Sequence, residues 1–163
     1  MDRRIVAGGV VVVAAVAAYL IFRPNEQPGA TLEPQQLIDL LADTAREVNA
    51  RAPVMVDAET RLRGADSEGA KLTYHYILVQ MNKADIDSRK FVALKKPEIV
   101  ASACTRAEVR YLLNQGATLA YVYDDKLGER IADVGLARSR SEDTRLNSSH
   151  GYISYAVFCL KKK

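Results

Sequence analysis

The chain has 163 residues, with 23 Lys and Arg against 20 Asp and Glu and a formal net charge of +3. Residues 140–163 hold five of the basic and two of the acidic residues, so residues 1–139 carry 18 of each and no net charge. This balance, together with the absence of any run that interleaves Lys or Arg with aromatic residues, argues against binding to nucleic acid or to an anionic membrane surface.

An apolar run near the start predicts a membrane anchor. Residues 5–22 (IVAGGVVVVAAVAAYLIF) are 18 consecutive uncharged residues, the short end of what spans a hydrocarbon core of about 30 Å. Arg3 and Arg4 precede the run and only Arg23 follows it closely, so the positive-inside rule places residues 1–4 in the cytoplasm. We therefore expect an uncleaved single-pass helix in the inner (cytoplasmic) membrane, with the rest of the chain in the periplasm or outside the cell.

Two alternatives to this anchor stay open. A signal peptide could be cut after Ala18, although Leu20, Ile21 and Phe22 continue the apolar stretch beyond that point. A buried core helix would need a larger domain to surround it than about 100 residues provide. Residues 23–30 (RPNEQPGA), which contain two prolines, are then a short polar tether.

Residues 31–139 are predicted to form an extracytoplasmic α+β domain. Apolar residues recur at helical spacing over 32–49, and Pro53 ends that helix. Residues 54–63 (VMVDAETRLR) alternate as a strand, and 72–81 (LTYHYILVQM) form a second strand rich in β-branched and aromatic residues. The polar loop GADSEGA would join these two strands in a long hairpin.

The second half of the domain repeats this pairing of strands after two helices. A helix begins near Ser88 and breaks near Pro97, and a shorter one, opened by the capping-box string TRAE, ends at Gly116. Residues 118–123 and 129–137 form another hairpin around DDKLG. The predicted order is α-β-β-α-α-β-β, with an antiparallel four-stranded sheet and the helices packed on one face.

Residues 140–163 are interpreted as foreign to the protein. Read back into codons, TRLNSSH and ISYAVFCLK resemble the two constant blocks of a short-read sequencing adapter, separated by the two codons of Gly151 and Tyr152. Alternating apolar residues in the second block could instead form a native C-terminal strand. We exclude the segment as read-through, and with it Cys159 and His150.

Several strings in the domain are similar to a family of small, uncharacterised bacterial proteins that are exported or membrane-anchored. They are VNARAPVMVDAETRL, LTYHYILV, Cys104 before a short helix, LAYVYDD and IADV, and they cover residues 48–134. The resemblance implies a location and a fold rather than an activity. It also implies a second cysteine near the family's C-terminus, which would be the native disulfide partner of Cys104 and is missing here once residues 140–163 are excluded.

Cys104 and His75 are the candidates for thiol or metal chemistry. An odd cysteine outside the cytoplasm predicts a disulfide, with a buried inert thiol or a catalytic thiolate as alternatives. One histidine with scattered acids does not supply a metal's ligand set, and Asp124 and Asp125 fit a tight turn before Gly128 better than a calcium loop. We expect no metal and no cofactor.

Asp57 and Glu59 are predicted to share a strand face with Arg61 and Arg63. Paired carboxylates could perform acid–base chemistry if the pKa of one were shifted. A solvated ladder of opposite charges across the hairpin is the interpretation we favour. A small hydrolase that uses these acids remains the alternative function.

Two pairs of tyrosines complete the set of candidates. Each pair is spaced by two residues and so lines one face of its strand, and neighbouring hairpins would join them into one aromatic patch. The members are Tyr74, Tyr76, Tyr121 and Tyr123. They could be core residues with hydroxyls at the rim, or a partner-binding surface.

The sequence contains no catalytic motif. We therefore expect a protein-interaction or envelope-structural module whose partner is another envelope protein. Capture of a small ligand between the helices and the sheet is a further alternative.

Overall fold

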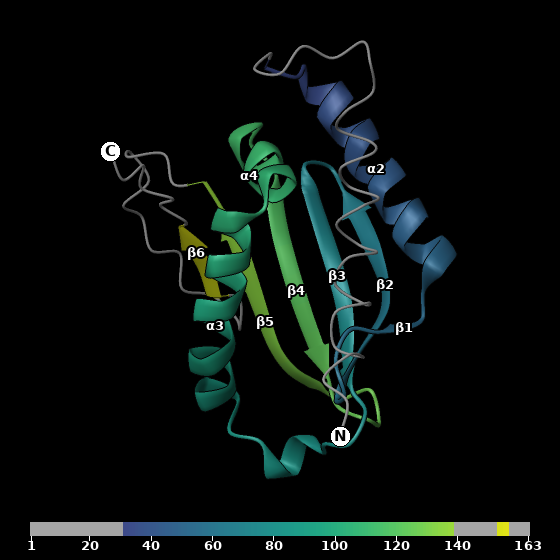
Figure 1. The fold of residues 1–163 in the computed structure, drawn as a ribbon, viewed down its shortest axis with the longest axis vertical. Helices are drawn as coiled ribbons and strands as arrows, with labels where there is room; N and C mark the ends of the chain where they lie inside the picture. The colour runs from purple at the N-terminus through teal and green to yellow at the C-terminus, as the bar shows by residue number, and fades with distance from the viewer. Residues whose placement is uncertain (1–30, 139–152, 157–163) are drawn as a thin grey trace, which may run out of the picture.

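The fold is seen in a computed structural model, which describes residues 31–138 and the backbone of residues 153–156 (Figure 1). The elements follow the order α2 (Pro34–Arg51), β1 (Val54–Met55), β2 (Thr60–Glu68), β3 (Lys71–Leu78), the 3-10 helix η1 (Lys83–Asp85), α3 (Ser88–Thr105), α4 (Ala107–Asn114), β4 (Thr118–Asp124), β5 (Arg130–Ala137) and β6 (Ile153–Ala156). The α+β class and the helix–strand order over residues 31–138 match the prediction, except that the first predicted strand is divided into two.

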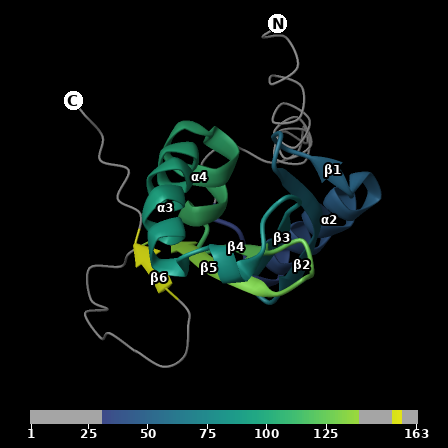
Figure 2. The same cartoon turned by 90° about the horizontal axis from the view of Figure 1, so that it is seen from below.

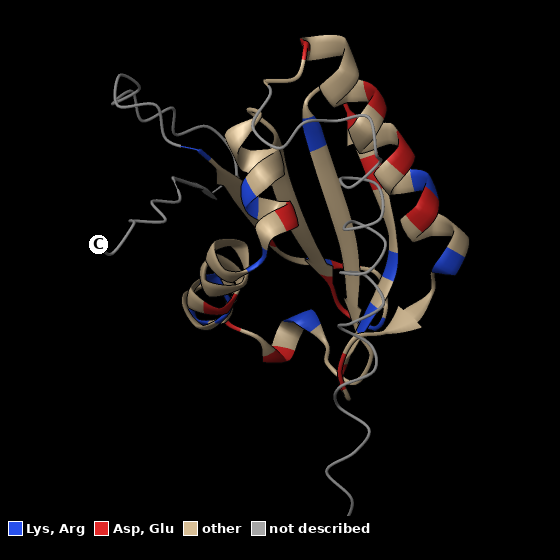
Figure 3. Cartoon of the chain, turned by 45° about the horizontal axis from the view of Figure 1, so that its top comes forward, with Lys and Arg blue, Asp and Glu red and all other residues tan. Residues whose placement is uncertain are grey.

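Helix α2 begins and ends two residues later than the predicted range 32–49. Pro34 occupies the first turn, where a missing N–H costs nothing, and the backbone N–H of Glu33 donates to the Gln36 side chain at 2.9 Å. Leu37, Leu41 and Val48 recur at helical spacing and are buried. Figure 3 shows several charged residues along α2.

The sheet is mixed and has six strands, so the prediction of an antiparallel four-stranded sheet is wrong. Its strand order is β1-β2-β3-β4-β5-β6, and β3 runs parallel to β4, with Lys71 opposite Thr118 and Ile77 opposite Asp124. The remaining neighbours among β1 to β5 are antiparallel. Parallel neighbours need a crossover, which η1, α3 and α4 supply. Pairing adjacent strands into hairpins could not reveal that the two hairpins would meet in parallel.

The first hairpin is shifted toward the C-terminus relative to the prediction. The chain turns after β1, so 54–63 is not one strand, and most of the predicted loop GADSEGA belongs to β2. Those residues pair with β3, with Ala65 opposite Tyr74 and Glu68 opposite Lys71. The tight turn falls at Gly69, whose φ of 53° favours glycine.

Helix α3 continues through Pro97 instead of breaking there. Pro97 is exposed, so the lost N–H leaves no buried carbonyl behind. The predicted capping box at TRAE does not form either, because Arg106 occupies the N-cap of α4 without a side-chain hydrogen bond and the Thr105 hydroxyl donates to the carbonyl of Ala101 at 2.9 Å. Gly116, with φ 95°, follows α4 as predicted.

One hydrophobic core joins all three helices to a single face of the sheet. It combines Leu41 of α2, Ile99 of α3 and Leu112 of α4 with Leu72 of β3 and Val134 of β5. Figure 1 shows α2 beside β2, with α3 and α4 beside β4 and β5, and Figure 2 gives the perpendicular view. The prediction that the helices lie on one face is confirmed. The middle of that face, over β3 and β4, lies between the helices.

Two predicted segments fall partly or wholly beyond this description. Within residues 31–138, no helix is long and apolar enough to cross a membrane. The predicted anchor, residues 5–22, lies outside the described residues. Strand β6 lies within the segment that resembles translated adapter and pairs parallel with β5, with Val134 opposite Ile153. The interpretation of residues 140–163 stays a prediction.

Candidate interaction surface

The four predicted tyrosines form one stacked ladder across β3 and β4. The parallel register sets Tyr74 opposite Tyr121 and Tyr76 opposite Tyr123. The ring centroids are 5.7 Å apart for Tyr74 and Tyr121, 6.4 Å for Tyr76 and Tyr121, and 5.2 Å for Tyr76 and Tyr123. These distances fall in the range of favourable ring pairs, each of which contributes about 0.5–1.5 kcal/mol beyond burial of its area.

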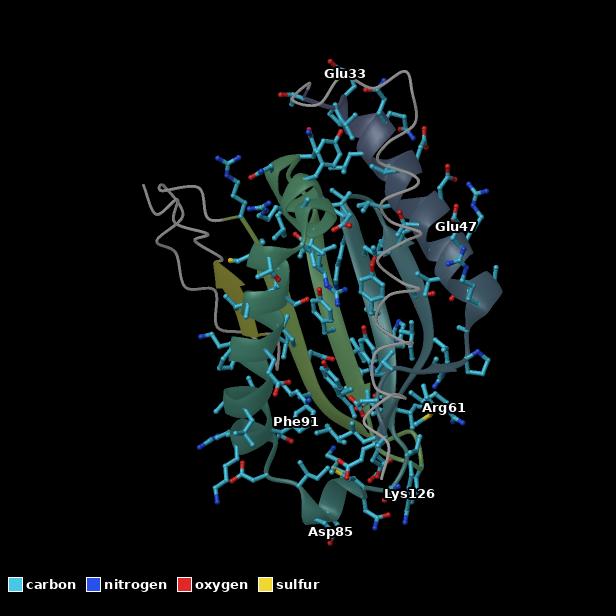
Figure 4. All side chains as sticks on the ribbon, in the orientation of Figure 1. Glu33, Glu47, Arg61, Asp85, Phe91 and Lys126 are labelled. Carbon is cyan, nitrogen blue, oxygen red and sulfur yellow. The ribbon has the colours of Figure 1, made fainter. Side chains whose placement is uncertain are left out.

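Phe91 closes one end of this tyrosine ladder. Its ring, in the first turn of α3, meets Tyr123 edge-on with centroids 5.1 Å apart (Figure 4). Tyr123 is only 6% exposed, whereas Tyr74, Tyr76 and Tyr121 are half-buried and pack against the edge of the core. One end of the ladder thus belongs to the core, and the remaining rings stay partly accessible.

Burial keeps all four phenols neutral. Loss of hydration raises the pKa of Tyr121 to about 12, and the charge of Arg106 opposes that rise. Burial and the neighbouring Tyr121 raise the pKa of Tyr74 and Tyr76 further, again against Arg106. The pKa of Tyr123 is raised by burial and then by Tyr121, Glu98 and Asp57. Ionisation inside the ladder is therefore unfavourable at any physiological pH.

The carboxylate pair proposed for a hydrolase is not on a strand face. Asp57 lies in the turn between β1 and β2, where its Oδ1 accepts the N–H of Glu59 at 2.8 Å and of Thr60 at 2.7 Å. Such a side chain shapes a turn by hydrogen-bonding the backbone two residues on. Glu59 is exposed. The pattern that suggested acid–base chemistry is accounted for by this turn.

Asp125 joins two loops rather than binding calcium. Its side chain is 1% exposed; Oδ1 accepts the N–H groups of Leu127 and Glu129 at 2.8 Å, and Oδ2 accepts that of Lys83 at 2.9 Å. The N–H of Lys83, with those of the turn, lowers the pKa of Asp125. Both oxygens are thus occupied by backbone donors.

Asp124 and His75 are also paired. Asp124 accepts from Arg130 Nε at 2.6 Å, and His75 Nε2 lies 2.7 Å from Asp66 Oδ2. Among residues 31–138, no group of three or more His, Cys, Asp or Glu side chains could hold a metal ion.

Cys104 is half-buried near the end of α3 and packs against the core. No free thiol is found in the described part of the chain. The predicted native partner would lie beyond Ser139, outside the described residues, so the disulfide expected from the family resemblance stays a prediction.

Three contributors to this region went unpredicted. Phe91 of α3 contacts Tyr123, and the charge of Arg106, between α3 and α4, acts on the pKa of Tyr121. A pattern within one strand cannot reveal either. Asn49 exchanges hydrogen bonds with Ala65 at the edge of β2. The Val-Asn pair that opens the family pattern was the only signal for Asn49, and its spacing alone did not assign it a contact.

Three solved structures share this fold. A protein titled a putative secreted protein from Pseudomonas aeruginosa is 23% identical, with a TM-score of 0.55 over 67% of this chain and 96% of that chain. The pilotin EpsS of the Vibrio vulnificus type 2 secretion system is 16% identical, with a TM-score of 0.53 over 64% and 90%. The pilotin AspS from Vibrio cholerae is 14% identical, with a TM-score of 0.51 over 64% and 91%. At these identities the likeness shows the fold alone.

The family is shown by sequence. No match was found among curated proteins. A family model described as "Putative quorum-sensing-regulated virulence factor" matches residues 30–137, which is 108 of the 163 residues and contains the resemblance noted over 48–134. The chain therefore belongs to this family, whose description names a putative quorum-sensing-regulated virulence factor.

Proposed function

We propose that the protein is an interaction module of the bacterial envelope that binds an apolar segment of another envelope protein across the tyrosine ladder. The observation that carries this proposal is the half-burial of Tyr74, Tyr76 and Tyr121 in the middle of the sheet. Tyrosine is enriched at protein interfaces because it offers a large rigid ring together with a polar tip.

The residues around the ladder favour a protein-binding surface over a catalytic site. Asp57 and Asp125 accept backbone N–H groups, and among residues 31–138 no group of three or more His, Cys, Asp or Glu could hold a metal ion. Few residues of the central strands are charged, whereas α2 contains several charged residues (Figure 3). An uncharged aromatic strip bordered by polar helix surfaces is the usual composition of a binding surface.

The similar solved structures support a location in the bacterial envelope. Two of the similar structures are titled pilotins of type 2 secretion systems, and a third is titled a putative secreted protein. We place the module at the outer side of the inner membrane, held by residues 5–22 and the tether 23–30. The arrangement would keep the tyrosine ladder within reach of other envelope components.

Site-specific photocrosslinking in the native host tests the proposal. A benzophenone amino acid at position 121 should give a discrete crosslinked species, whereas the same group at Arg46, on the exposed side of α2, should not. Co-purification of the crosslinked protein with the unlabelled chain should then be lost in Tyr121→Ser and kept in Arg46→Ser. Equal crosslinking from both positions, or unchanged co-purification by Tyr121→Ser, would contradict it.

A further inference from the structure

The chain enters the described domain at the end of the sheet where both central strands begin. The N–H of Leu32 donates to Gln115 Oε1 at 2.8 Å, and Leu32 packs against the core. Gln115 follows α4 and lies three residues before Thr118, the first residue of β4, which is opposite Lys71 of β3. This hydrogen bond therefore fixes where the 30 residues that precede the described part join it.

The tyrosine ladder starts three residues along the strands from this entry point. Tyr74 follows Lys71 and Tyr121 follows Thr118 by three positions, a distance of about 10 Å at the rise of a strand. The half-buried rings of Tyr74, Tyr76 and Tyr121 lie on the side of the sheet that packs against the helices. Their part of that side lies between α2 and the pair formed by α3 and α4 (Figure 1).

Residues 5–22 match the ladder in length. As a helix, these 18 residues would extend about 27 Å, and the eight residues of β3, Lys71–Leu78, extend about 26 Å. The tether 23–30 also has eight residues and reaches at most about 28 Å. That reach is enough to bring residues 5–22 over the ladder from the entry point at Leu32.

The run and the ladder also match in chemistry. Residues 5–22 contain no charged side chain, and Tyr19 carries their only polar side-chain group. The helix-facing residues of the two central strands are all uncharged: Leu72, Tyr74, Tyr76 and Leu78 of β3, and Leu119, Tyr121 and Tyr123 of β4. Exposing an apolar run of this size to water costs free energy in proportion to its area. The tyrosine rings offer it an apolar cover within reach.

We propose that residues 5–22 of the same chain cover the tyrosine ladder until they enter the membrane, and that insertion uncovers the ladder for its partner. This inference rests on the proposed function, because it adds a regulation to the same surface. A tether of eight residues keeps the run at an effective concentration of about a millimolar. The run therefore excludes a dilute partner from the ladder unless the membrane has removed it, which confines binding to anchored chains.

Photocrosslinking of the full chain with and without lipid tests the inference. The chain is made by cell-free translation with a benzophenone amino acid at position 121, and is irradiated in buffer or with vesicles of phosphatidylethanolamine and phosphatidylglycerol. In buffer we expect a crosslink at the mass of the monomer, which mass spectrometry should map to residues 5–22. With vesicles this crosslink should be lost. The same group at Arg46, which is exposed on α2, should not crosslink to residues 5–22 in either condition.

Variants of the run separate its apolar character from its length. Val12→Asp with Val16→Asp keeps the length but places two charges four residues apart, on one face of a helix. This double variant should lose both the crosslink in buffer and the insertion into vesicles. Val12→Leu with Val16→Leu is the matched control and should keep both. Circular dichroism shows whether each chain is folded, and position 74 takes the benzophenone if the chain labelled at position 121 is not.

The outcomes separate the two proposals. A folded chain that gives no crosslink from the ladder to residues 5–22 in buffer would overturn the covering of the ladder and leave the partner-binding surface standing. A crosslink found only at the mass of a dimer would do the same, because the run would then act between copies. A crosslink that persists undiminished with vesicles would overturn both proposals, because the ladder would stay closed to a partner.

Discussion

Asn49 of α2 and Ala65 of β2 exchange two hydrogen bonds of 2.8 Å. The side-chain amide of Asn49 donates to the carbonyl of Ala65 and accepts the N–H of the same residue. Strand β1 pairs with β2 only opposite Arg61 and Leu62, so at Ala65 the amide takes the place of a neighbouring strand. An otherwise open sheet edge is covered in this way by one side chain.

We predict that Asn49→Ala lowers the free energy of unfolding by about 1–3 kcal/mol, since two hydrogen bonds to a buried residue's backbone are lost. Urea unfolding followed by circular dichroism measures the change. Asn114→Ala, at the exposed last residue of α4, is the control and should shift the midpoint little. Equal effects of the two substitutions would show that water replaces the amide of Asn49 without cost.

Gly64 is predicted to be coupled to Asn49. A Cβ at Gly64 would lie 2.6 Å from Asn49 Oδ1, and that oxygen cannot move without breaking its bond to Ala65. Gly64→Ala should therefore destabilise the native protein and should cost less when Asn49 is already Ala. A double-mutant cycle measures the difference, which we expect to be about 0.5–2 kcal/mol; additive effects would contradict the close approach.

We predict that Asp57 stabilises the turn between β1 and β2 and is not a catalytic residue. Asp57→Asn keeps an oxygen that can accept the N–H groups of Glu59 and Thr60, so stability should be nearly unchanged. Asp57→Ala removes that acceptor and should cost about 1 kcal/mol. Chemical unfolding of both variants checks this order. Loss of a hydrolytic activity on Asp57→Asn, with stability intact, would instead revive the catalytic interpretation.

Asp125 is predicted to make stability fall in acid. The pKa of Asp125 is lower in the folded chain than in the unfolded chain, where a carboxyl group has a pKa of about 3.9. Ionised Asp125 therefore stabilises the fold at pH values above about 3.9. This stabilisation is lost as the pH falls through the lower pKa of the folded state. Asp125→Asn should lower Tm at neutral pH. The difference in Tm between this variant and the unaltered chain should become smaller below about pH 4. Glu68→Gln, exposed at the end of β2, should show no such narrowing.

The tyrosine ladder is predicted to destabilise the fold in alkali. Burial raises the pKa of Tyr121 in the folded protein to about 12, whereas its pKa in the unfolded chain is about 10. The contribution of neutral Tyr121 to folding stability is therefore complete below about pH 10. It is lost as the pH rises through the pKa of the folded state. Between these two pKa values, the free energy of unfolding should decrease less steeply with pH in Tyr121→Phe than in the unaltered chain. The difference in slope should be up to about 1.4 kcal/mol per pH unit. Phe91→Leu should lower stability without changing that slope, and a slope unaltered by Tyr121→Phe would contradict the raised pKa.

The elements that depend on local pattern could be predicted from the sequence. The helical spacing of Leu37, Leu41 and Val48, and the alternation around Tyr74 and Tyr76, are set by burial on one side of an element, which the order of residues records directly. The tyrosine patch followed from the same rule once the two strands were neighbours.

The other features of the fold could not be predicted, because they depend on contacts between residues that are distant in the sequence. Nothing within GADSEGA indicates that it pairs with β3, because Ala65 is held by Asn49 from α2 and by Tyr74 from the next strand. The parallel pairing of β3 and β4 depends on where α3 and α4 return the chain.

The parallel seam between β3 and β4 also divides the chain into two halves. Each half has its own antiparallel partners, β1 to β3 on one side and β4 with β5 on the other, and Tyr74 and Tyr121 are 47 positions apart along the chain. Closing so long a loop is slow compared with forming a hairpin. The stacked rings therefore come together only when the halves join, and the absorbance or fluorescence of these tyrosines during refolding would time that joining, separately from the formation of either half.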